Sequence, residues 1–152
     1  MKFKIIDLSD GSQKDCSFED LSTSLYSNCI ILRVRKEGLE SIGLVTHHTL
    51  TYFAVEFANY ALKNYTKENI PTAQTCIDLT RKWLEDQSSV SKKELRTAAD
   101  AAYAAAYVAA YAAYVAAADA TDAAYAAAAA GKNKLDEQNR QGTFILNFFG
   151  VE

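Results

Sequence analysis

The chain has 152 residues, with 16 Lys and Arg against 19 Asp and Glu, and a formal net charge of −3. This length suits a single domain with a real hydrophobic core. The charge excludes the basic footprint of a nucleic-acid-binding protein. It is also too small and too dispersed for a protein that mimics DNA.

The pattern of apolar residues predicts a cytoplasmic protein. Residues 1–10 lack the segments of a secretory signal peptide. No apolar run reaches the roughly 18 residues of a membrane-spanning helix, because aspartates interrupt the long alanine tract. Cys16, Cys29 and Cys76 form an odd, unpatterned set, as is typical of reduced thiols.

The first 46 residues predict a small β element. Lys2–Leu8 partly alternates and ends at a Ser-Asp-Gly turn, which indicates a strand. A weak capping pattern predicts a short helix near Phe18–Tyr26. Cys29–Arg35 is β-branched and predicts a second strand, whereas Ser41–Thr46 fits either a third short strand or an extended link.

The hydrophobic period becomes helical from residue 50. Apolar residues at three-four spacing predict a helix over 50–67, and Pro71 can open a second helix over 72–86. Trp83 lies at the centre of the apolar stripe of that second helix, so we expect it to anchor the helix to the preceding one. Ser91 and Glu94 form a capping box that opens a third helical segment over 91–130.

Between Ala98 and Ala130, 22 of 33 residues are alanine. On a helix this tract has one nearly bald alanine face, suited to close packing against a neighbour or a second copy, and one tyrosine face. A single helix over 91–130 would be about 60 Å long, too long for a compact domain. We therefore expect a break at Asp119–Asp122 and two helices folded back on each other; the alternative is one long projecting helix.

The tyrosine face has two interpretations. One is filling of the core, because an apolar helical stripe is most often buried. The other is a recognition surface, because tyrosine is enriched at interface hot spots. The candidate partner-binding residues are Tyr103, Tyr107, Tyr111, Tyr114 and Tyr125.

Residues 132–141 are charged and predict a solvated segment, after which apolar residues either return to the core or form a docking end: Phe144, Ile145, Leu146, Phe148 and Phe149. Together these elements predict a mainly α fold (α+β), an antiparallel alanine-rich helical bundle with a small N-terminal β element. The expected organisation is one compact domain, with strands and a short helix in 1–46 packed on a bundle in 47–152.

The sequence offers no catalytic or metal-binding constellation, and we expect neither enzyme activity nor a cofactor. Adjacent side chains such as His47 and His48 diverge, so a solvated turn is the favoured interpretation. Cys76 lies within an apolar stripe and is expected to be buried. Arg81 and Glu85 have the spacing of a surface ion pair. Three aspartates of the alanine tract point in different directions and are expected to solubilise it: Asp100, Asp119 and Asp122.

A resemblance covers about residues 50–131. Pro71 is preceded by A-V-E-F-A-N-Y-A-L-K-N-Y (54–65) and followed by C-I-D-L-T-R-K-W-L-E-D (76–86). An alanine-rich tract comes last. This succession resembles the immunity proteins of bacterial polymorphic-toxin systems. The family's Ile-acidic-x-x-Arg-x-Trp pattern is matched by Ile77, Asp78, Arg81 and Trp83. Here tyrosines replace the family's histidines and glycines in the last helices, and similar Ala–Tyr tracts occur in phage proteins.

The resemblance implies a protein that binds and neutralises another macromolecule. The partner would be a toxin, or a component of a defence system if the chain is a phage-encoded anti-defence protein such as an anti-CRISPR, with no direct contact to nucleic acid or membrane. The alternative is a structural, self-associating helical protein, for example a homodimer. An enzyme with an unrecognised site is a further alternative, and a polar pocket holding His47 or His48 would favour it.

Overall fold

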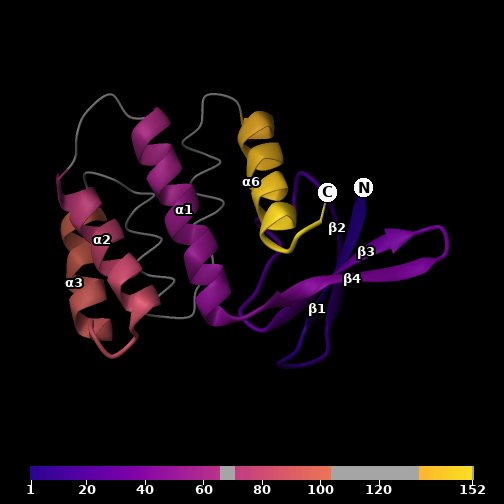
Figure 1. Cartoon of the computed structure of the whole chain (residues 1–152), viewed down its shortest axis with the longest axis horizontal. Helices are drawn as coiled ribbons and strands as arrows, with labels where there is room; N and C mark the ends of the chain where they lie inside the picture. The colour runs from indigo at the N-terminus through magenta and orange to yellow at the C-terminus, as the bar shows by residue number, and fades with distance from the viewer. Residues whose placement is uncertain (66–70, 104–133, 152) are drawn as a thin grey trace.

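The computed structural model describes residues 1–65, 71–103 and 134–151 (Figure 1). In this part of the chain the strands come first and the helices follow. They are β1 Lys2–Asp7, β2 Gln13–Ser17, β3 Cys29–Arg35, β4 Gly38–Val45, α1 His47–Tyr65, α2 Pro71–Glu85, α3 Lys92–Tyr103 and α6 Lys134–Phe148. In Figure 1 these helices lie together on one side, and the β3–β4 hairpin points away from them.

The architecture is a mixed α+β fold with a four-stranded antiparallel sheet in the order β2-β1-β3-β4, so the predicted mainly helical bundle is wrong. The prediction missed β2 because Gln13–Ser17 lacks apolar alternation, and it shortened β4 because Gly38 and Gly43 weaken the strand pattern. Both segments become strands by pairing with β1 and β3, which shows tertiary context overriding local propensity.

The predicted short helix over 18–26 is also wrong, because turns occupy this segment. Ser17 donates a hydrogen bond from Oγ to the Asp20 carboxylate at 3.0 Å, and the amides of Leu21 and Ser24 bond to the carbonyls three residues earlier. The segment nevertheless contributes to the core, since Leu21 and Leu25 are buried.

The inner face of the sheet forms one hydrophobic cluster with the helices. Alternate strand residues are buried there, as the period of two requires: Phe3, Ile5, Cys29, Ile31 and Val45. They meet buried residues of α1 and α6 in the same cluster, including Phe53, Phe57 and Ile145. The rings of Phe53 and Phe148 are 5.1 Å apart, and those of Phe57 and Phe144 are 5.6 Å apart.

α2 and α3 form a second, smaller cluster around Trp83. Trp83 is 6% exposed, which confirms its predicted burial, and it packs with Val90 and Leu95. The predicted capping box of α3 is confirmed: the amide of Glu94 donates to Ser91 Oγ, and the amide of Ser91 donates to the Glu94 carboxylate, both at 3.1 Å. This cluster fixes the turn between α2 and α3.

The last described helix corrects the prediction for residues 132–141. α6 begins at Lys134, and its Glu137 and Gln141 are buried at 1% and 0% exposure, so a wholly solvated segment is wrong. The predicted return of Ile145 and Leu146 to the core is confirmed, whereas Phe148 remains 47% exposed. Among the described residues, no helix combines the length and apolar character that a membrane crossing requires.

Candidate functional site

The candidate site predicted from the sequence falls outside the described part of the chain. Four of its tyrosines lie there, namely Tyr107, Tyr111, Tyr114 and Tyr125, and Tyr103 ends α3 without a described side chain. The expected break at Asp119–Asp122 and most of the bald alanine face lie there too. The tyrosine surface therefore stays a prediction.

The structure places His47 and His48 in the first turn of α1 and not in a solvated turn, because Thr46 caps the helix through a bond from the Thr49 amide to its Oγ at 3.1 Å. Both rings lie against Trp83, with centroids at 5.6 Å and 6.1 Å. Nε2 of His48 donates to the carbonyl oxygen of Leu84 at 2.6 Å.

This histidine arrangement joins the start of α1 to the end of α2 and to the loop before β3. The Leu84 carbonyl is one of the carbonyls at the end of α2 that lack a partner within the helix, and a histidine there satisfies it. Nδ1 of His47 lies 3.2 Å from Ser27 Oγ, in the loop before β3. No cluster of three or more metal-ligating side chains occurs within residues 1–65, 71–103 and 134–151.

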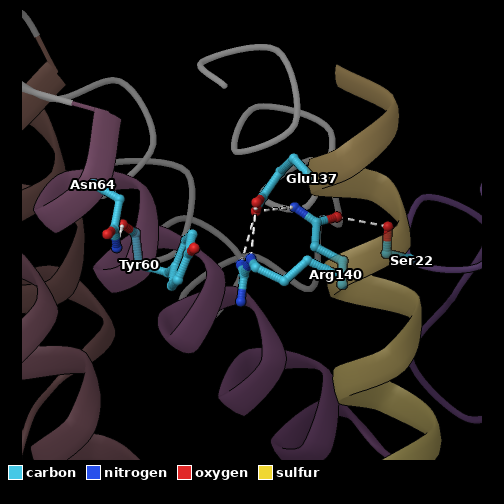
Figure 2. Close-up of polar contacts among 6 residues, drawn as sticks. Ser22, Tyr60, Asn64, Glu137 and Arg140 are labelled. Atoms are coloured by element: carbon cyan, nitrogen blue, oxygen red, sulfur yellow. Dashed lines mark hydrogen bonds and ion pairs between the residues drawn. The ribbon is translucent and has the colours of Figure 1, made fainter. Parts of the chain in front are cut away.

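A buried polar network links α6 to the loop before β3 (Figure 2). Arg140 donates to both carboxylate oxygens of Glu137 at 2.7 and 2.8 Å, and Gln141 donates to one of them at 3.1 Å. Ser22 donates from Oγ to the amide oxygen of Gln141 at 2.6 Å. The guanidinium of Arg140 also lies 3.5 Å from the centre of the Tyr60 ring on α1.

The network is suited to holding α6 in place. The Glu137 side chain is fully buried, and its oxygens accept bonds from Arg140 and Gln141 of its own helix. Sequence reasoning missed it because 132–141 reads as a solvated run. A signal existed, since Glu137, Arg140 and Gln141 have the spacing of one helical face. Similarly, Arg81 pairs with Glu56 of α1 at 3.1 Å, and not with the predicted Glu85.

The outer face of the sheet, which points away from the core cluster, carries apolar side chains on three strands. Register aligns Ile6 with Ile30 and Ile30 with Leu44 in one row, and Val34 with Leu39 in another. We call this set the outer apolar face: Ile6, Ile30, Leu32, Val34, Leu39 and Leu44. Val34, Leu39 and Leu44 are 43%, 56% and 49% exposed.

The outer apolar face departs from the usual pattern, because the solvated face of an antiparallel sheet normally carries polar side chains. An open hollow of about 480 Å³ lies beside it and is lined by Val34 and Leu39 together with Lys2, Lys4 and Asp15. Lys4 and Asp15 form an ion pair at 2.8 Å that borders the hollow. Sequence reasoning missed this surface, because an apolar run such as C-I-I-L is also typical of a strand that is buried on both faces.

The described residues therefore present two features of interest, a structural polar network and an uncovered apolar sheet face. The sheet face is the better candidate for a functional surface, because contiguous exposed apolar side chains mark interaction sites in soluble proteins. A scan of protein-family models found no family that matches the chain, and searches of curated proteins and of solved structures found no match either.

Proposed function

We propose that this chain is a non-enzymatic binding protein that neutralises another protein, and that the outer apolar face is part of its binding surface. The observation that carries the proposal is the exposure of Val34, Leu39 and Leu44 on one face of the sheet. Leaving such side chains in water forgoes the stabilisation that burial would provide. A partner that covers them recovers it.

The chemistry of this face suits a protein partner. It is wide, since it spans β1, β3 and β4, and it is apolar at its centre with charged groups such as Lys4 and Asp15 at its border. An apolar centre within a polar rim is the usual anatomy of a protein–protein interface. The resemblance of residues 50–131 to immunity proteins points to a toxin as the partner; a defence-system component is the alternative if the chain is phage-encoded.

The test is a neutralisation assay with proteins encoded beside the gene of this chain. Each candidate target is expressed in bacteria with the wild-type chain or with Val34→Lys, and colony formation and the dissociation constant of the complex are measured. We expect Val34→Lys to weaken binding at least about tenfold, because it places a charge among the exposed apolar side chains of the outer apolar face. Leu135→Lys is the matched control, because Leu135 is 53% exposed and belongs to α6 and not to a strand of the sheet.

Stoichiometry separates this proposal from an enzyme. A binding inhibitor protects only when it is present in about equimolar amount with its target. Protection by a small fraction of that amount, together with a changed mass of the target, would show catalysis and overturn the proposal. Unchanged binding by Val34→Lys would show that the outer apolar face is not part of the binding surface.

A self-associating protein is the second candidate, and a separate feature favours it: among the described residues, β4 forms an edge of the sheet.

A further inference from the structure

The two edges of the sheet differ in how they are protected from pairing with another strand. The β2 edge has five residues and carries Gln13, Lys14 and Asp15. The β4 edge has eight residues, G-L-E-S-I-G-L-V, with neither lysine nor proline. Short length, lysine, proline, inward-pointing charges and β-bulges are the usual devices that keep an edge unpaired. β2 is short and carries a lysine, whereas β4 has only Glu40 and one bulge.

Glu40 is the single charged residue of β4, and its charge is neutralised within the hairpin. Arg33 lies 2.7 Å from the Glu40 carboxylate, and Arg35 also donates to it. Hydrogen bonds from Arg35 and then Arg33 hold the pKa of Glu40 below its usual value, so the group stays paired as a carboxylate. This residue therefore does little to repel an approaching strand.

A β-bulge in β4 gives the edge an apolar, self-complementary pattern. Ile31 pairs with Gly43 and Leu32 pairs with Ser41, so Ile42 is the extra residue. Ile42 is buried, and the extra residue shifts the alternation by one. Leu39 and Leu44, five residues apart, consequently both lie on the outer face, which an unbroken strand would not allow.

We propose that β4 is a homodimerisation edge, which pairs antiparallel with β4 of a second copy about a two-fold axis normal to the sheet. Centring the pair between Ser41 and Ile42 places Leu39 of each copy opposite Leu44 of the other on the outer face. It also places Glu40 opposite Gly43, which has no side chain of its own and whose inner side is covered by the ring of Phe149. The two bulges meet at the centre, so hydrogen bonding is expected mainly in the two outer halves of the pair.

The second copy suits this edge because the same patch is complementary to itself, as a two-fold interface requires. No like charges face each other in this register, since Glu40 meets glycine. Pairing would join two four-stranded sheets into one, within the usual size of open sheets. The inference goes beyond the proposed function, because it concerns contact between two copies and needs no target.

The first experiment measures molar mass by light scattering over a wide range of concentrations, without a target. The wild-type chain should rise from 16.7 kDa toward twice that mass. Ser41→Lys and Leu44→Lys place a charge on the edge and should weaken association at least about tenfold. Circular dichroism verifies that both variants fold. Leu135→Lys is the matched control and should dimerise like the parent.

The second experiment tests the register. In a Cys16→Ser background, Leu39→Cys and Leu44→Cys proteins are oxidised separately and as a mixture. The proposed register predicts a disulfide-linked dimer in the mixture and much less in either protein alone. A wild-type chain that stays monomeric throughout, or a dimer that survives Ser41→Lys and Leu44→Lys, would overturn the proposal, as would a β4 that pairs with strands of other proteins only.

Val34→Lys separates this inference from the proposed function. Val34 lies on β3, inside the sheet, so its substitution should weaken target binding and leave the dimer intact. Target binding through the outer apolar face and dimerisation through β4 can therefore be tested independently of each other.

Discussion

The ring of Phe149 lies on Gly43 of β4 so closely that a Cβ added to this glycine would overlap the ring atoms. Phe149 follows α6, and the centres of its ring and the Phe53 ring of α1 are 6.2 Å apart, so the contact joins the sheet edge to α1 and α6. Gly43 is therefore needed for space and not for backbone conformation.

Gly43→Ala should destabilise the protein by about 1–3 kcal/mol, since the ring has to move out of a packed position. Urea denaturation measures the change. In a Phe149→Leu background the same substitution should cost less, because the smaller side chain leaves room. Ser41→Ala, at an exposed position of β4, is the control and should be near neutral. Equal costs in both backgrounds would show that Phe149 is not the obstacle.

Arg140→Met should lower the free energy of unfolding by about 3 kcal/mol or more, because it removes the guanidinium from the buried Glu137 carboxylate. Adding Glu137→Leu should recover part of the loss, since the uncompensated charge is then gone. Arg35→Met is the control: its partner Glu40 is exposed, and such pairs contribute only about 0–1 kcal/mol. A loss for Arg140→Met no larger than for this control would contradict the structural role of the network.

Trp83→Ala should destabilise the protein by about 3–5 kcal/mol, the usual cost of truncating a core aromatic. Trp83→Phe keeps most of the volume and should cost much less. Thermal melting followed by circular dichroism measures both variants. An unchanged melting temperature for Trp83→Ala would show that Trp83 contributes little to the stability of the α2–α3 cluster. Trp83 would then become a candidate binding residue.

Stability should fall as the pH rises above 9, in part because of Cys76. Burial raises the pKa of its thiol from 9.0 to about 12. Above pH 9 the unfolded chain loses this proton while the folded protein keeps it, so ionisation favours unfolding until the pH exceeds the folded pKa. Since Tyr and Lys also titrate there, the measured quantity is the difference from Cys76→Ala between pH 8 and 10. The variant should lose less stability over this interval than the parent; equal losses would show an accessible thiol.

The sequence allowed prediction of those elements whose own residues carry a strong period. α1 and α2 were expected within three residues of their observed ends, and Trp83 and Cys76 were correctly expected to be buried. β2 was not predicted, because its polar residues become a strand only through pairing with β1. The outer apolar face could not be identified either, since it depends on which strands become neighbours and which face the helices cover.

The bond between Ser22 and Gln141 joins residues 119 positions apart, and it has a consequence for how the chain folds. The sheet and α1 are complete by residue 65, yet part of their apolar face is covered by Ile145 and Leu146 of α6, which begins at residue 134. On the ribosome, that part of the face would stay open in a nascent chain until α6 emerges. Such long-range closure slows folding and prolongs the exposure of aggregation-prone surface. We therefore expect folding in the cell to depend on chaperones more than the modest size of the chain suggests.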